Sequence, residues 1–172
     1  MILIVLCIAS LAHAATRVGG GANTPINITS DRFDVYSEKR IAVFSGNVVV
    51  TQEDTTIKSD EFYLHYYKPK EATARKKSQV INAGAAANMG EIQKIEARGR
   101  VIIRQKEKIL TGENAVFFND ERKIIVTGTP EMREGDNIIK GDKITFFLTE
   151  NRGVVESSKE TRVTATIYPE QQ

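Results

Sequence analysis

The sequence is short of the residues that carry much of protein chemistry. Its 172 residues include one cysteine, no tryptophan, four prolines and two histidines. The single thiol, Cys7, lies in an apolar run at the start of the chain, and no small residue stands directly before it as a lipobox would require. A mature chain without this run has no disulfide and no cysteine-based metal site. We expect neither a metal nor a cofactor.

The chain also has little excess charge of either sign. The formal net charge is +2, and no basic stripe is interleaved with stacking aromatic residues. This composition argues against nucleic acid as a partner. Two local basic runs, 68–77 and 94–108, fit either a solvated face or attraction to phosphate-bearing lipid at a membrane surface.

The first 14 residues have the features of a signal peptide. Residues 1–11 form an apolar run too short to span a bilayer, and Ala12-His13-Ala14 has the small-x-small form of a cleavage site. We predict cleavage near Ala14/Ala15, followed by a flexible lead-in over residues 15–24. An exported chain that keeps no cysteine fits the bacterial periplasm.

Four tracts of the chain follow one pattern. Each begins with an aliphatic residue, has an acid three places on, and has apolar residues five and seven places on. The first two tracts start 29 positions apart, as do the last two, and the middle gap is one such step plus 24 residues. A repeat at this period indicates stacked supersecondary units that bury their apolar faces together. The tracts start at Ile28, Ile57, Leu110 and Ile139.

Each repeat also carries one acid and, eighteen positions after its start once the 24 extra residues of the second repeat are discounted, a glycine or serine. The acids stand one per repeat without a second ligand type, so we interpret them as bulges or turns that switch the inward face, in preference to a metal or catalytic site. The glycines carry no phosphate-binding motif and predict a tight bend. The acids are Asp31, Asp60, Glu113 and Asp142, and the second positions are Gly46, Gly99, Gly128 and Ser157.

Short runs with apolar residues at every second position predict strands. Polar segments at 37–40, 119–122 and 149–152 predict hairpin tips, and the extra residues, 66–93, stand at the equivalent tip of the second repeat. Pro130 fills a position held elsewhere by Val48 and Val101, which predicts a bulge or an edge. We predict a single all-β domain over 25–168 with a tail at 169–172, folded as an antiparallel roll or two facing sheets.

The repeated apolar positions form one inward-facing set. Its two sides either close into a dry core or part into a slot wide enough for acyl chains, and composition by itself favours the closed core. His65 has no serine, cysteine or acid partner at a recognisable spacing, so we expect no enzyme. The set comprises Ile28, Phe33, Val35, Phe44, Val48, Val50, Ile57, Phe62, Leu64, Val101, Ile103, Leu110, Phe117, Ile125, Ile139 and Phe146.

The two ends of such an array expose unpaired backbone groups. Neither the first strand, 25–28, nor the last, 162–167, has a proline within its interior. Strand edges of this kind invite pairing with another chain. The sequence therefore predicts a sheet that is open at both ends and capable of end-to-end association.

Three segments carry a family resemblance. Pro25–Asp31, Phe44–Gln52 and Asn137–Thr145 resemble signature segments of the OstA-like family of lipopolysaccharide-export bridge proteins (LptA), and the resemblance extends from Pro25 to about Tyr168. It implies an antiparallel β-jelly roll with a hydrophobic groove, copies joined head to tail, and a carrier without enzymatic activity. It also implies partnership with lipopolysaccharide through lipid A, with an LptC-like inner-membrane protein and with an LptD-like outer-membrane assembly.

The resemblance raises the expectation of an open slot. It implies that Ile26 and Ile28 face the inner-membrane partner and the groove mouth, and that the groove includes Phe44, Val48, Val50, Ile139 and Ile144. An open alternative is a polymerising periplasmic scaffold, or a sister module of the same export system, without a lipid slot. The partner edge is predicted at Ile26, Ile28, Val163, Ala165 and Ile167. The lipid-binding groove is predicted at Ile28, Phe33, Val35, Phe44, Val48, Val50, Ile57, Phe62, Leu64, Val101, Ile103, Phe117, Ile139, Ile144 and Phe146.

Overall fold

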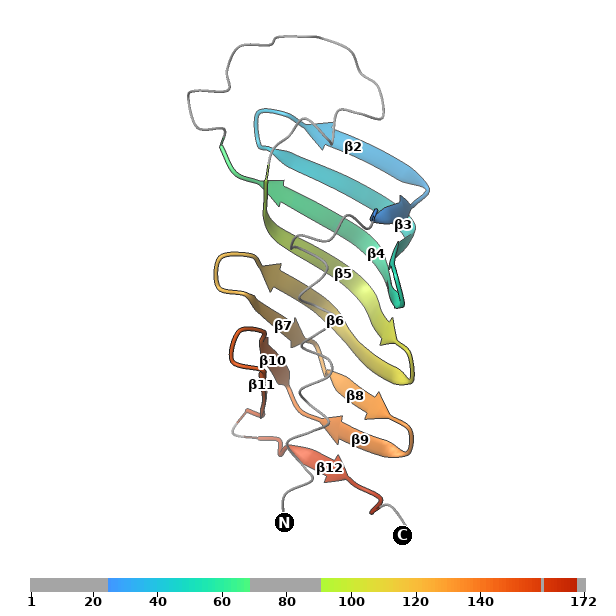
Figure 1. Cartoon of the computed structure of the whole chain (residues 1–172), viewed down its shortest axis with the longest axis vertical. Coiled ribbons are helices and arrows are strands. Elements are labelled where there is room, and N and C mark those ends of the chain that lie inside the picture. Colours follow the sequence, from blue (N-terminus) through green and yellow to red (C-terminus); the bar gives the residue numbers. More distant parts are fainter. Residues whose placement is uncertain (1–24, 69–90, 159, 170–172) are drawn as a thin grey trace.

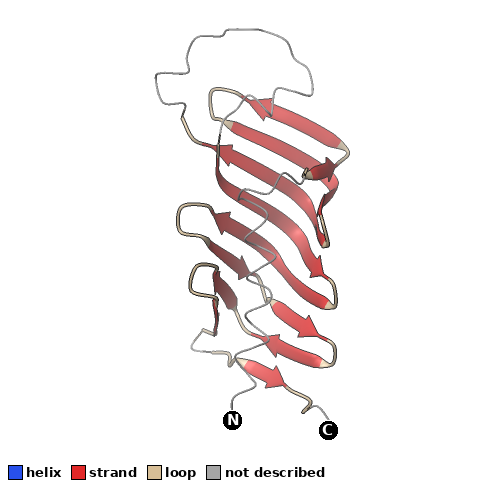
Figure 2. Cartoon of the chain, viewed as in Figure 1, coloured by secondary structure: helices blue, strands red, loops and turns tan. Residues whose placement is uncertain are grey.

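The computed structural model describes residues 25–68, 91–158 and 160–169. The predicted signal peptide, the lead-in at 15–24, most of the insertion and the end of the tail lie outside these ranges. All regular structure within them is β-strand, and no helix long and apolar enough to cross a membrane occurs there (Figure 2). The predicted all-β fold is confirmed.

Twelve strands are formed by the described residues, and they are arranged along the longest axis of the molecule with β2 towards one end and β12 towards the other (Figure 1). They are β1 (Asn27–Thr29), β2 (Arg32–Tyr36), β3 (Ile41–Gln52), β4 (Thr55–Tyr66), β5 (Ile92–Gln105), β6 (Lys108–Phe118), β7 (Lys123–Thr127), β8 (Glu131–Glu134), β9 (Asn137–Lys140), β10 (Lys143–Phe147), β11 (Arg152–Glu156) and β12 (Thr164–Thr166).

The strands form one antiparallel sheet that divides into two arms. The long strands β3 to β6 run through both arms, while the short strands belong to one arm each. β2 pairs with the first half of β3 and β1 with its second half. Likewise, β7 and β8 pair with the two halves of β6. The first arm continues through β10 and β11, and the second through β9 and β12.

A sharp bend separates the two arms, and its left-handed backbone conformation explains why glycine occurs there. Gly46 and Asn47 both have left-handed φ angles, 78° and 47°. The Asp31 side chain lies over Gly46 so closely that a Cβ there would come within 2.4 Å of Asp31 Oδ2. Asn47 Nδ2 donates a hydrogen bond of 2.8 Å to the same oxygen. The same left-handed pair recurs at Gly99–Arg100 and Gly128–Thr129.

The acids of the other tracts take equivalent places. Asp60 lies over Gly99 with the same 2.4 Å separation and accepts hydrogen bonds from Arg100. Asp142 accepts a hydrogen bond of 2.5 Å from the Ser158 backbone N–H. The register of the sheet shifts at these acids, so inward residues five positions apart, such as Ile57 and Phe62, share a face. The predicted bend and change of face are therefore present.

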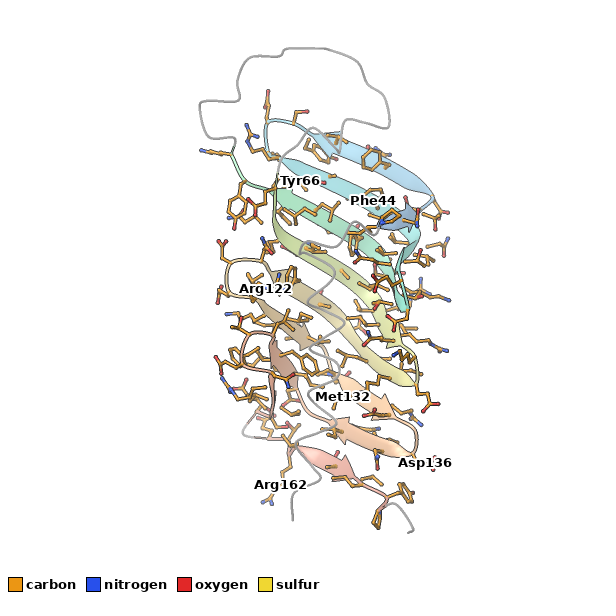
Figure 3. The ribbon with its side chains drawn as sticks, in the orientation of Figure 1. Phe44, Tyr66, Arg122, Met132, Asp136 and Arg162 are labelled. Carbon is orange, nitrogen blue, oxygen red and sulfur yellow. The ribbon has the colours of Figure 1, made fainter. Side chains whose placement is uncertain are left out.

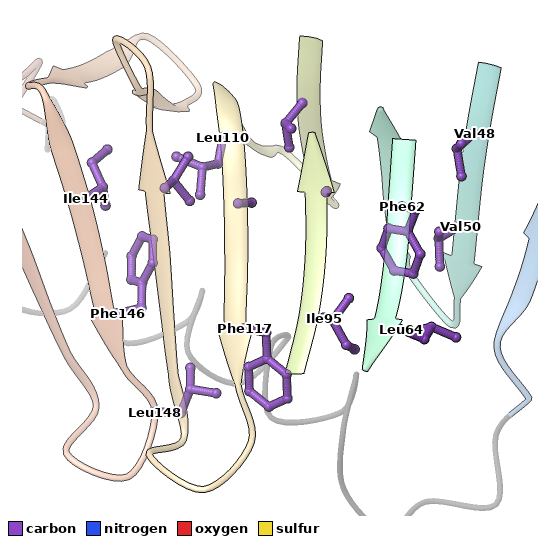
Figure 4. Close-up of a cluster of buried hydrophobic side chains, with 14 of the residues drawn as sticks. Val48, Val50, Phe62, Leu64, Ile95, Leu110, Phe117, Ile144, Phe146 and Leu148 are labelled. Atoms are coloured by element: carbon purple, nitrogen blue, oxygen red, sulfur yellow. The ribbon is translucent and has the colours of Figure 1, made fainter. Parts of the chain in front are cut away.

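The inward side chains of both arms pack into one cluster (Figure 4). Pro130 is fully buried in the break between β7 and β8, where a residue without an N–H interrupts the strand. The buried apolar residues are Ala42, Val48, Val50, Phe62, Leu64, Tyr66, Ile95, Ala97, Val101, Leu110, Ala115, Phe117, Val126, Met132, Ile144, Phe146 and Leu148.

Three details of the prediction are wrong. Ile125 lies opposite Thr145 on the outer face, because its neighbours Ile124 and Val126 are the residues that pack inward. The third hairpin tip is 148–151, and Arg152 already belongs to β11. The insertion is shorter than 66–93 at both ends, since β4 extends to Tyr66 and β5 begins at Ile92.

Candidate functional site: an apolar pocket at the amino-terminal end

A pocket of about 620 Å³ opens between the two arms near β1 and β2. Phe44, which contributes to its wall, lies at this end of the molecule, while Arg162 marks the opposite end (Figure 3). The pocket is lined by Ile26, Ile28, Thr29, Ser30, Phe33, Phe44, Val50, Phe62, Leu64, Ile92 and Ile95.

Cross-strand pairing brings residues of distant tracts together in the pocket. Ile28 of β1 lies opposite Val50 in the second arm, and Phe33 of β2 lies opposite Phe44 in the first. The rings of Phe33 and Phe44 stack with their centroids 4.6 Å apart. Phe33 remains 43 % exposed, because β2 is a terminal strand with no further strand beside it in the described part of the chain. The pocket is therefore a consequence of where the sheet ends.

The floor of the pocket is formed by core residues, and its rim carries two hydroxyls. Phe62 and Ile95 are buried beneath it. Thr29 Oγ1 donates to the Val49 carbonyl at 3.5 Å, and Ser30 Oγ donates to the Arg32 carbonyl at 2.9 Å. None of the eleven lining residues has a titratable side chain. Such a site suits the binding of apolar groups and offers no acid–base chemistry.

The structure separates the predicted groove residues into groups. Six of them line the pocket: Ile28, Phe33, Phe44, Val50, Phe62 and Leu64. Five are buried in the packed interior and do not line it: Val48, Val101, Phe117, Ile144 and Phe146. Three are partly buried against that interior: Ile57, Ile103 and Ile139. Val35 is half-buried opposite Ala42 without lining the pocket.

Sequence reasoning missed several lining residues. The sequence prediction places Ile92 in the insertion and omits Ile95, although Ile95 alternates with Ala97 on the inward face of β5. Ile26, predicted for the partner edge, also lines the pocket. Alternation within β5 was the signal that could have identified Ile95, whereas nothing local marks Ile92.

The two ends of the sheet carry exposed strand edges. In the described part of the chain, β1 and β2 pair only with β3, β11 pairs only with β10, and β12 pairs only with β9. Six of the seven exposed large hydrophobic residues lie at these ends. They are Ile26, Phe33 and Tyr36 at one end and Val163, Ile167 and Tyr168 at the other. The predicted edge residue Ala165 is exposed as well, and Ile28 is half-buried.

An ion-pair cluster lies on the outer face of the first arm. The buried Glu96 carboxylate contacts Lys94, Arg98 and His65, whose Nε2 lies 3.2 Å from Glu96 Oε1. The structure thus supplies His65 with an acid neighbour that sequence spacing did not reveal. Burial lowers the pKa of His65, and the charge of Lys94 lowers it further. Burial raises the pKa of Glu96, but hydrogen bonds from Lys94 and Arg98 outweigh burial and hold it below its usual range.

The acids of the four repeats, Asp31, Asp60, Glu113 and Asp142, do not form a common site. A hydrogen bond from Arg100 holds the pKa of Asp60 below its usual range, and hydrogen bonds from Thr161 and Ser158 do the same for Asp142. Among the described residues, no three His, Cys, Asp or Glu side chains are placed to hold a metal ion together.

The fold and the pocket define an open-ended antiparallel β-roll whose apolar interior is reached from one end. The chain belongs to the family described as LptA/(LptD N-terminal domain) LPS transport protein, whose model matches residues 27–152. This confirms the resemblance found in the sequence. The family is one of lipopolysaccharide transport components, not of enzymes.

A solved structure has the same fold. It is the crystal structure of LptH, described as the LptA homologous periplasmic component of the conserved lipopolysaccharide transport device from Pseudomonas aeruginosa. The match has a TM-score of 0.63 with 16 % sequence identity and covers 84 % of this chain and 96 % of that one. At this identity the likeness shows the fold. Comparison with curated proteins gave no match.

Proposed function

We propose that the chain is a periplasmic carrier that holds the lipid A part of lipopolysaccharide in the apolar pocket. Copies joined head to tail then bridge the inner and outer membranes. An LptC-like protein at the inner membrane and an LptD-like assembly at the outer membrane pair with its two strand edges. The observation that carries the proposal is the pocket of about 620 Å³, lined without a single titratable side chain.

The binding energy comes from sheltering acyl chains from water. Each methylene removed from water contributes about 0.8 kcal/mol. Ile28, Phe44 and Phe62 supply the apolar surface, and Thr29 and Ser30 lie where the polar part of the lipid leaves the pocket. An aliphatic chain therefore partitions strongly into the pocket.

Onward movement is passive in this account. The packed interior beyond the pocket is apolar from Val48 to Phe146, so chains that part the two arms meet the same kind of surface throughout. A similar pocket in the next copy makes transfer nearly isoenergetic. Direction is supplied from outside the chain, by an ATPase at the inner membrane.

Photo-crosslinking in cells tests the groove assignment. A photoreactive residue at Phe44 or Val50 is expected to form a lipopolysaccharide adduct, because both side chains line the pocket. Val43 and Val49 are matched controls: each precedes a test position on the same strand and points to the other face. Equal labelling at the test and control positions, or no adduct at either test position, would instead favour the scaffold without a lipid slot.

A further inference from the structure

One row of inward-facing positions in the second arm is polar, although the row beside it is apolar. The polar positions stand two residues closer to the tips of the second arm than apolar residues such as Val50 and Leu110, and alternation places both rows on the same face. The members of the row lie opposite one another across neighbouring strands. This polar row comprises Gln52, Thr55, Gln105, Lys108, Glu134 and Asn137.

The polar row is not simply turned toward water. Gln52 is 8 % exposed and Thr55 is 7 % exposed, so both count among the few buried polar residues of the described ranges. The side chain of Lys108 is 12 % exposed. Burying polar groups is costly unless hydrogen bonds compensate them, and an aliphatic residue at these positions would continue the core. A row of polar residues here therefore calls for a polar partner.

Contacts with neighbouring groups hold several members of the row in place. Lys108 Nζ lies 3.1 Å from Glu134 Oε1. Gln105 Nε2 donates a hydrogen bond of 3.3 Å to Asp54 Oδ1, and Asn137 Oδ1 accepts one of 2.8 Å from the Tyr168 N–H. Side-chain amides carry both donor and acceptor groups, and each of these bonds uses only one of them. The row is thus a fixed line of groups able to make further hydrogen bonds.

The first arm has the opposite character at its own tips. Its inward residues there include Leu64, Phe117 and Leu148, all of them buried and apolar. Moreover, all seven phenylalanines of the chain belong to strands, or strand halves, of the first arm. Figure 4 shows Phe62, Phe117 and Phe146 among its buried side chains. The two arms therefore offer a guest molecule one polar margin and one aromatic, apolar wall.

We propose that the polar row binds the linkage region of the carried lipid, where ester and amide groups join the acyl chains to a sugar. The acyl chains then lie toward the first arm. This inference rests on the proposed function and adds to it a subsite for a defined chemical group. It gives the lipid one orientation between the arms, with the sugar at the tips of the second arm.

The chemistry of the row fits this guest. Ester and amide carbonyls accept hydrogen bonds, and the Thr55 hydroxyl, the Gln105 amide and the Lys108 ammonium donate them. Two residues of a strand span roughly 7 Å, so a chain attached at the row passes the apolar row within its first few carbons. A plain hydrocarbon gains nothing from the polar row. The row therefore selects acylated sugars over other apolar molecules.

Replacing Thr55 and Gln105, which lie opposite each other, tests the subsite. Thr55→Val with Gln105→Met keeps the size of both side chains and removes their hydrogen-bonding groups. We expect lipid A to bind this double variant about ten-fold more weakly, since two hydrogen bonds are lost. Binding of a hydrophobic fluorophore should stay within two-fold of the wild-type chain. Thr56→Val with Arg104→Met is the matched control: these residues also lie opposite each other, one position away on the outer face.

A change on the ligand gives a second readout that uses the wild-type chain. An acylated glucosamine with ester and amide linkages is compared with an ether-linked analogue that has the same chains and no carbonyls. The wild-type chain is expected to prefer the carbonyl-bearing ligand by about ten-fold, and the Thr55→Val, Gln105→Met variant should lose this preference. Circular dichroism checks that the variants keep their strands.

The outcomes separate this inference from the proposed function. Loss of the preference in the double variant, with the control unchanged, supports the subsite. If the wild-type chain binds both glucosamine ligands equally, or if the double variant keeps the full preference, the subsite is wrong while lipid carriage stands. Equal weakening of lipid A and the fluorophore in the double variant also overturns it. Failure of lipid A to displace the fluorophore from the wild-type chain overturns the proposed function itself.

Discussion

At the residue scale, the bend between the arms depends on glycine and acid together. Gly46 combines a φ of 78° with a carboxylate packed directly over its Cα. A left-handed φ is costly for any residue with a side chain, and here the space that a Cβ needs is also occupied. The Asp31 side chain therefore packs over the bend and accepts a hydrogen bond from Asn47. This accounts for the pairing of an acid and a glycine in three of the four tracts without a catalytic or metal-binding role.

Substituting Gly46 with alanine should destabilise the fold more than the backbone strain alone. We expect a loss of about 2–4 kcal/mol in the free energy of unfolding, since left-handed strain and overpacking against Asp31 add together. Gly135→Ala is the matched control: its φ is 56°, but an added Cβ meets nothing within 4 Å. Urea unfolding followed by circular dichroism measures both. Equal losses in the two variants would remove the packing role of Asp31.

At the element scale, the strands differ in what they contribute. β6 lies in the middle of the sheet, and its Phe117 is 7 % exposed within the core. β2 ends the first arm, and its Phe33 is 43 % exposed at the pocket. The long strands therefore join the two arms and supply part of the pocket lining, whereas the terminal strands β1 and β2 complete the pocket where the sheet ends.

Alanine at these two phenylalanines should separate stability from binding. Phe117→Ala is expected to cost about 3–5 kcal/mol, because it leaves a cavity in a packed interior. Phe33→Ala should cost about 1 kcal/mol, since nearly half of the side chain is already in water. Thermal unfolding and binding of a hydrophobic fluorophore are measured on both. The account requires Phe33→Ala to bind the fluorophore more weakly while it melts close to the wild-type temperature, and the reverse result would contradict it.

Much of the strand order could be predicted from the sequence, because alternation and turn residues are local signals. The tips at 37–40 and 119–122 and the change of face at Asp60 follow from such signals. The inward face of β7 could not be predicted reliably. Ile124 and Ile125 are adjacent and chemically identical, and the pairing of Ile124 with Phe146 shows which of the two packs against the core. The division into two arms likewise depends on register between strands that lie far apart in the sequence.

At the scale of the whole molecule, the structure combines the two predicted alternatives: a closed core over most of its length and an open pocket at one end. The interior is packed around Val101, Phe117 and Ile144, and it opens into the pocket beside β1 and β2. The same apolar residue types serve in both places. The sequence indicates which residues face inward, but the separation of the arms depends on what packs between them, and single residues do not encode it. Ile92 illustrates this, since it joins the pocket from a strand that begins directly after the insertion.

The most direct test of the central claim is whether lipid A competes for the apolar pocket of the purified chain. A hydrophobic fluorophore bound to the wild-type chain should be displaced by lipid A in a saturable way. Phe44→Asp should bind both ligands at least about ten-fold more weakly, because burying a carboxylate among apolar groups is costly. Val43→Asp, which changes the opposite face of the same strand, should leave both affinities unchanged. Failure of lipid A to displace the fluorophore, or equal binding by the two variants, would contradict the account.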